Sequence, residues 1–131
     1  MLKEFIICAM ILFSIIFGNY KIQKYTTESI TTISNELNEL REELFKNEKN
    51  MKEIDVKNKI DKVWEEWELR HDKLAYFIEH NELEKVEINL TALKSYADTE
   101  EFTNSINELD KSIFLLNHIQ DKYAFNLQNV F

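Results

Sequence analysis

Hydrophobic residues recur every three or four positions over most of the chain, which is the spacing of one face of an α-helix. Ahead of this pattern, residues 5–17 form an apolar run without a charged residue. The periodic part predicts four helices, over residues 30–44, 49–79, 81–97 and 98–119. Their apolar stripes are Ile30, Ile33, Leu37, Leu40 and Leu44; Ile60, Trp64, Trp67, His71, Leu74 and Ile78; Leu83, Val86, Leu90, Leu93 and Ala97; and Phe102, Ile106, Leu109, Ile113 and Leu116. Phe114, Leu115 and Ile119 widen the last stripe, so the fourth helix is expected to be the most buried.

Polar residues suggest where these helices begin and end. Asn81 with Glu84, and Asp98 with Glu101, have the spacing of capping boxes and predict the starts of the third and fourth helices. Residues 122–131 lose the helical period and are expected to pack back as an extended tail. Short connections then make neighbouring helices antiparallel, so the sequence predicts an all-α, up-and-down bundle of about four helices.

The first predicted helix has two open questions at its ends. A break or kink is expected within residues 47–50, where polar residues interrupt the stripe. Met51 and Ile54 continue the register, so a single long helix through this stretch is the alternative. Before the first stripe, residues 26–34 are rich in threonine and serine and have weak helix propensity. They form either a loose stalk or a continuation of the helix that precedes them.

The apolar run at the start of the chain has the length of a membrane span once its flanks are included. Thirteen helical residues cover about 20 Å, short of a hydrocarbon layer of about 30 Å. A helix over residues 2–20 covers about 29 Å, with Lys3 reaching outward at one end and Tyr20 at the other interface. Its side chains, among them Phe5, Ile11 and Phe17, would then face lipid.

This segment lacks the small residues that signal peptidase requires before a cleavage site. Cleavage after Gly18 would need a small residue where Ile16 stands, and cleavage after Ser14 would need one where Leu12 stands. We therefore expect a retained signal-anchor. The domain organisation expected is a membrane anchor over 1–20, a juxtamembrane stalk over 21–29 and a helical bundle domain over 30–131.

Basic residues near the span barely decide its orientation. Lys3 and the α-amine lie on one side, and Lys21 and Lys24 on the other. A very short arm ahead of a first apolar segment is typical of a signal-anchor, so we expect a single-pass protein of the cell membrane. Its soluble domain is expected outside the cytoplasm.

Composition and charge exclude several classes of protein. The chain has no proline, one glycine and one cysteine, which argues against an all-β fold and excludes a disulfide scaffold. Its net charge of -8 repels nucleic-acid phosphates and indicates no positive patch for anionic lipid. The single cysteine, Cys8, lies in the apolar segment, and Gly18 is the sole glycine, so neither a nucleophilic centre nor a phosphate-binding loop is evident. We expect a protein that is not an enzyme and holds no cofactor.

Three residues are candidate metal ligands. His80, Glu87 and His118 carry ligand types that suit a divalent cation, and they would approach one another if the fourth helix crosses the second. The alternative is that His80 caps the last carbonyl groups of the second helix and that Glu87 makes an ordinary polar contact. His71 lies within the second stripe and is interpreted as a half-buried residue of the helix interface.

Aromatic residues are the candidates for contact with a partner. Trp64 and Trp67 are three positions apart, and each is large enough to anchor either the core or another protein. Tyr96 is a further candidate on an exposed face. The oligomeric state does not follow from the sequence.

From the first tryptophan onward, the order of short motifs resembles a known family. The motifs are Trp64-x-x-Trp67, Phe77-Ile78-Glu79-His80-Asn81-Glu82-Leu83, Val86-Glu87-Ile88, Leu93-Lys94-Ser95-Tyr96, Leu115-Leu116-Asn117-His118-Ile119 and Leu127-Gln128-Asn129-Val130-Phe131. They are similar to the bacterial family catalogued as domain of unknown function 4363, small proteins with one N-terminal apolar segment. The chain departs from the family pattern over residues 45–63. The resemblance implies a membrane address and a helical architecture, without an activity.

Two functions are consistent with these features. The first is a membrane-anchored module outside the cytoplasm that binds another protein, expected to be a neighbouring membrane protein, while its first helix contacts membrane lipid. The alternative is a small-ligand or metal-binding sensor domain on the same tether, built around His80, Glu87 and His118.

Overall fold

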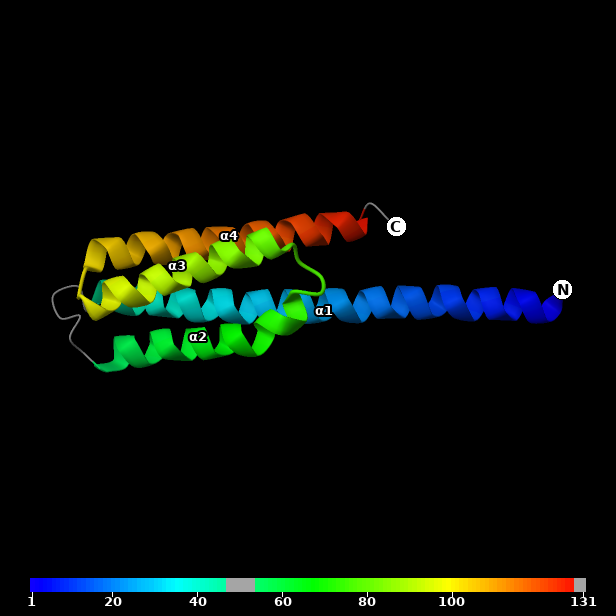
Figure 1. Cartoon of the computed structure of the whole chain (residues 1–131), viewed down its shortest axis with the longest axis horizontal. Helices are drawn as coiled ribbons and strands as arrows, with labels where there is room; N and C mark the ends of the chain where they lie inside the picture. Colours follow the sequence, from blue (N-terminus) through cyan, green and yellow to red (C-terminus); the bar gives the residue numbers. More distant parts are fainter. Residues whose placement is uncertain (47–53, 129–131) are drawn as a thin grey trace.

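The computed structural model of the chain shows four helices, of which the first is much the longest (Figure 1). The structure describes the backbone of residues 1–46 and 54–128 and the side chains of residues 1–46 and 56–123. In this part of the chain the elements are α1 (Leu2–Lys46), α2 (Ile54–Leu74), α3 (His80–Asp98) and α4 (Phe102–Gln128), without a strand. The predicted all-α fold class is confirmed.

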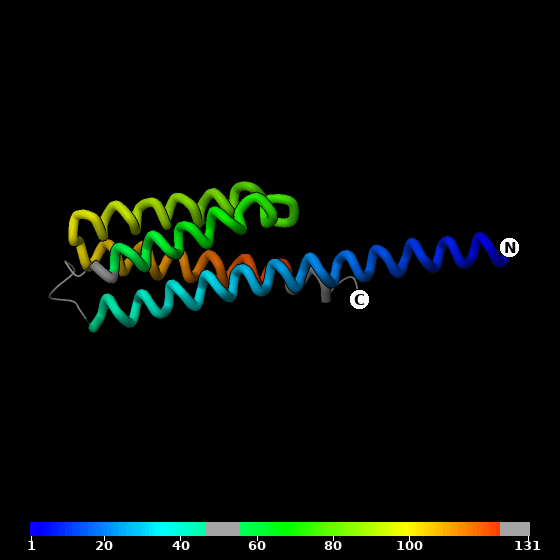
Figure 2. Tube along the Cα trace, turned by 90° about the horizontal axis from the view of Figure 1, so that it is seen from below, coloured from blue at the N-terminus to red at the C-terminus, as the bar shows by residue number. Residues whose placement is uncertain are grey.

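The helices pack in a ring in chain order. α1 packs on α2 and α4, and α3 packs on the same two helices, while the described residues show no contact across either diagonal. Short connections over residues 75–79 and 99–101 join α2 to α3 and α3 to α4. Neighbouring helices therefore run antiparallel, as the tube view also shows (Figure 2).

The core consists largely of the apolar stripes predicted from the sequence. Every stripe residue of α1 and α3 is buried, which confirms the register of these two helices. In α2, Trp64 and His71 are half-buried, and in α4 Phe102 and Ile113 are half-buried at the edge of the core. The stripe of α4 was expected to be widened by Phe114, but this side chain is 70% exposed and lies outside the core.

The apolar segment and the first bundle helix form one continuous helix. α1 passes through residues 26–34 without interruption, so the helical alternative for this stretch is the one observed. Thr26 and Ser29 are buried there, and Arg70 of α2 donates a hydrogen bond of 3.2 Å to the Ser29 hydroxyl. Packing against neighbouring helices therefore overrides the weak helix propensity of threonine and serine. The expected break within residues 47–50 lies outside the described residues.

The end of α2 and the start of α3 differ from the sequence prediction. α2 ends at Leu74 instead of Glu79, because the chain tightens there into a turn with i to i−3 hydrogen bonds. Asn81 lies inside α3, whose N-cap is Glu79 without a side-chain capping bond, so the predicted capping box is wrong. The backbone N–H of Glu79 instead donates to the Tyr123 hydroxyl of α4 at 2.8 Å.

The connection from α3 to α4 is also not a capping box. Asp98 is the last residue of α3, and Glu100 has a φ of 60°. The N–H of Glu101 donates to the carbonyl of Tyr96, and that of Glu100 to Ala97, which is the hydrogen-bond pattern of a Schellman motif. Asp98 therefore lies at the end of α3 and does not cap the start of α4, so the predicted capping box is wrong.

The expected extended tail is helical as far as the structure describes it. α4 continues to Gln128, so the prediction is wrong for residues 122–128, and residues 129–131 lie outside the described part. Lys122 fixes this end of α4 to α3 through ion pairs with Glu82 at 3.0 Å and Glu79 at 3.6 Å. The hydrogen bond to Glu82 raises the pKa of the Lys122 ammonium group.

Candidate functional site

The two tryptophans of α2 have different environments. Trp67 is 1% exposed in the core, and its indole Nε1 has no hydrogen-bond partner within the described residues. Trp64 is half-buried, and its Nε1 donates to Glu68 one turn further along at 2.8 Å. Trp67 therefore cannot contact a partner in the folded state, and of the two alternatives open from the sequence the structure assigns it to the core. Tyr96 of α3 is half-buried.

The structure does not gather the three candidate metal ligands. The described residues hold no group of three or more histidine, cysteine, aspartate and glutamate side chains that could bind a metal ion. Glu87 instead lies near His71, with 3.9 Å between Glu87 Oε2 and His71 Nε2. His118 stacks on Phe114 along α4, and His80 is the exposed first residue of α3.

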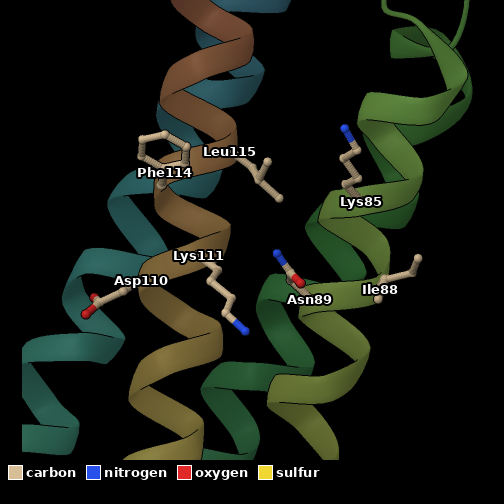
Figure 3. Close-up of a pocket in the computed structure, with 7 residues that line it drawn as sticks. All are labelled: Lys85, Ile88, Asn89, Asp110, Lys111, Phe114 and Leu115. Carbon is tan, nitrogen blue, oxygen red and sulfur yellow. The ribbon is translucent and has the colours of Figure 1, made fainter.

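A shallow groove with a volume of about 540 Å³ lies on the outer surface of the α3–α4 pair. The residues that line it are Lys85, Ile88, Asn89, Asp110, Lys111, Phe114 and Leu115, which we call the outer groove. In Figure 3, Leu115 and Lys111 extend from α4 toward α3, and Asn89 extends from α3 toward α4. Phe114 is 70% exposed and Ile88 is 59% exposed, so the groove presents apolar surface to its surroundings.

The rim of the outer groove carries mostly basic side chains. Asp110 is turned toward α1, where Arg41 donates to it at 2.7 Å, so its charge is paired away from the groove. Lys111 forms an ion pair with Glu108 at 3.0 Å in the preceding turn. No ion pair of Lys85 is found among the described residues. The groove therefore combines an apolar floor with a basic rim on a protein of net charge -8.

The sequence prediction missed the outer groove because it assigned Phe114 and Leu115 to the core. Ile88 was a signal that could have revealed it, because this residue lies two positions from both Val86 and Leu90 and so falls off the buried stripe. An apolar residue off the stripe of an amphipathic helix is exposed unless another element covers it.

The N-terminal part of α1 carries a second exposed apolar surface. Its first eighteen residues contain no buried side chain, and Phe5, Ile11 and Phe17 are all exposed. α1 is long and apolar enough in this part to cross a membrane. In Figure 1 this half of the helix extends past the rest of the bundle, on the side where α4 ends.

These features define a class of protein: an antiparallel four-helix bundle whose first helix begins as an exposed apolar segment. The chain belongs to the family described as Domain of unknown function (DUF4363), whose model matches residues 20–130. The resemblance stated from the sequence motifs is confirmed. No curated protein and no solved structure matches the chain significantly.

Proposed function

We propose that this protein is a membrane-anchored helical module that binds another membrane protein. The N-terminal half of α1 lies in the bilayer, the bundle stands outside the cytoplasm, and the outer groove receives the partner. The observation that carries the proposal is the continuity of α1, which is exposed and apolar in its first half and part of the bundle core in its second half.

Lipid is the environment that suits the exposed half of α1. Phe5, Met10 and Phe13 are at least 65% exposed, and burial of each such side chain stabilises by about 1.5–3 kcal/mol. An exposed apolar surface that extends over five helical turns is far larger than the patches of soluble monomers. Insertion of this segment also confines the bundle to the bilayer surface, which raises its effective concentration toward other proteins of the same membrane.

The outer groove suits a helix that is apolar on one face and acidic at its edge. Its apolar floor can accept the apolar side chains, as in other helix-in-groove contacts, and Lys85 can pair with a carboxylate of the partner. The charge of this rim favours encounter with an acidic partner and disfavours a basic one.

The anchor and its orientation can be tested by thiol labelling of intact cells. In a Cys8→Ser background, we expect Thr103→Cys, at the end of the bundle remote from the span, to react with a membrane-impermeant maleimide. Lys3→Cys, on the opposite side of the span, should react after permeabilisation only. Extraction of the chain by alkaline carbonate would refute the anchor, and the reverse labelling pattern would refute the orientation.

The role of the outer groove can be tested by site-specific photocrosslinking in the native membrane. A photoreactive residue in place of Ile88 should capture a discrete partner, whereas the same residue in place of Asn38, on the exposed face of α1, should not. Phe114→Asp should abolish the adduct while the helical content by circular dichroism is unchanged. The proposal would be refuted if the adduct at residue 88 still formed in the Phe114→Asp variant. It would also be refuted if the crosslinked segment of the partner were basic.

A further inference from the structure

A second groove lies where the apolar half of α1 meets the bundle. It is lined by Lys21, Ile22, Lys24, Tyr25, Glu28, Lys73 and Phe77, has a volume of about 340 Å³, and is here called the lysine groove. α1 supplies five of these residues, α2 supplies Lys73, and the turn after α2 supplies Phe77. The groove therefore exists only because the α2–α3 turn packs beside the start of the bundle part of α1.

We propose that the lysine groove binds the phosphate headgroup of an anionic phospholipid and thereby holds the α2–α3 turn on the bilayer surface. This inference rests on the membrane anchor proposed above. It adds a second membrane contact, made by the folded bundle and not by the span.

The position of the groove along α1 puts it within reach of the lipid headgroups. If the span ends at Tyr20, Lys21 and Tyr25 lie about 1.5 and 7.5 Å further along the helix axis. The headgroup region of each leaflet is about 5–8 Å thick, which is half the difference between the whole bilayer and its hydrocarbon core. Lys73 is held at the same level, because its ammonium group lies 4.9 Å from the centre of the Tyr25 ring.

The charges of the groove are available to an anion. Lys21 lies over the Phe17 ring at 4.8 Å and Lys73 over Tyr25, and the described residues show no ion pair for either lysine. Lys24 is 3.9 Å from Glu28, the one carboxylate among the lining residues that the structure describes. The lining residues therefore include three lysines and one glutamate, although the chain as a whole is strongly acidic.

Aromatic residues at the same end favour a lipid surface over a soluble anion. Tyr76 is 83% exposed at the tip of the α2–α3 turn, beside the half-buried Phe77. Tyr20 is exposed at the end of the span. Aromatic side chains concentrate at the membrane–water interface, where an apolar ring and a polar tip are both accommodated.

The proposal can be tested with the full-length chain in vesicles of phosphatidylcholine with increasing phosphatidylglycerol. A spin label on Ala75→Cys, in a Cys8→Ser background, reports whether the α2–α3 turn lies in the headgroup layer or in water. We expect the label to enter the headgroup layer as phosphatidylglycerol is added. Lys73→Gln should raise the fraction of this lipid needed for half-maximal docking about fivefold, because each lysine at an anionic surface contributes about that factor.

The triple variant Lys21→Gln, Lys24→Gln and Lys73→Gln should leave the label in water at every lipid composition. A matched control removes the same charge from the opposite end of the bundle, with Lys46→Gln, Lys57→Gln and Lys94→Gln, and should dock as the unaltered protein does. Equal loss of docking in both triple variants would overturn the groove as the binding site and leave a general charge effect.

Flotation of the same vesicles separates this proposal from the anchor. If the chain does not float with vesicles, the anchor itself is refuted. If it floats and the label stays in water with phosphatidylglycerol present, the anchor stands and the lysine groove proposal is overturned. Release of the turn by inorganic phosphate, but not by chloride at equal ionic strength, would assign the groove to free phosphate and overturn the lipid assignment.

Discussion

Replacement of Trp67 by alanine tests whether α2 is packed as the structure shows. A buried tryptophan removes about 200 Å² from water, which corresponds to about 5 kcal/mol of transfer free energy. The substitution also removes an indole N–H that is buried without a hydrogen-bond partner in the described residues, which returns about 1–3 kcal/mol. We therefore expect Trp67→Ala to lower the free energy of unfolding by about 3 kcal/mol, a large part of the total of about 5–15 kcal/mol.

Trp64 supplies a matched control on the same helix. Its side chain is half-buried against the core and its Nε1 is bonded to Glu68, so by the same area arithmetic Trp64→Ala should cost about 2–3 kcal/mol. Trp67→Phe keeps most of the packing and removes the unpaired N–H, so we expect a loss smaller than that of Trp67→Ala. The free energy of unfolding of the three variants can be compared by urea unfolding of the full chain in detergent micelles, followed by circular dichroism at about 222 nm. A cost of Trp67→Ala below about 1 kcal/mol would contradict the assignment of Trp67 to the core.

Three further substitutions test single features of the bundle. Burial raises the pKa of Glu36, although Lys62 lies 3.6 Å from its carboxylate. The protonated carboxyl group therefore contributes to the stability of the folded state below the ordinary glutamate pKa. This contribution is lost as the pH rises through the raised pKa. Glu36→Gln should therefore flatten the pH dependence of the free energy of unfolding above the ordinary glutamate pKa, measured by urea midpoints. Glu100→Gly should raise the free energy of unfolding by about 0.5–1 kcal/mol, because glycine adopts the φ of 60° without the steric cost that glutamate has. Tyr123→Phe should lower it by about 1 kcal/mol, since the N–H of Glu79 loses its acceptor.

Each of these expectations can fail on its own. An unchanged pH profile after Glu36→Gln would show that burial does not raise the pKa of this carboxyl group in the folded protein. A destabilising Glu100→Gly would argue against the left-handed backbone at that residue. A neutral Tyr123→Phe would indicate that water replaces the hydroxyl as acceptor.

Helix periodicity was predictable because it depends on spacing alone. The stripe of α3, from Leu83 to Ala97, is buried as predicted, since residues three and four apart share a face of any α-helix. The helix ends were less predictable, because a capping box is one of several ways to satisfy the terminal N–H and carbonyl groups. Asp98 has the residue type of an N-cap, and yet it is the last residue of α3, whose end is closed by the backbone N–H groups of Glu100 and Glu101.

The candidate sites were hidden for a similar reason. Phe114 was expected in the core because it is apolar, but a ring of four helices buries only the face of α4 that meets α1 and α3, and Leu115 is half-buried at the edge of that face. Likewise, Glu87 was paired with His118 in the sequence prediction and lies near His71 in the structure. Which of two polar residues lies opposite a third depends on how the helices cross, and the spacing along one helix does not report that.

The amino-acid sequence alone determined that the chain is helical, that its core is made of four apolar stripes and that its first twenty residues are apolar enough to span a membrane. These properties follow from local spacing and composition. Only the tertiary structure joined the apolar segment and the first bundle helix into one rigid element, and only it brought Lys73 beside Lys21 and Lys24. The physical reason is that net charge and hydrophobic periodicity can be read directly along the chain. A surface patch instead depends on how the helices pack, because packing decides which of their faces lie side by side.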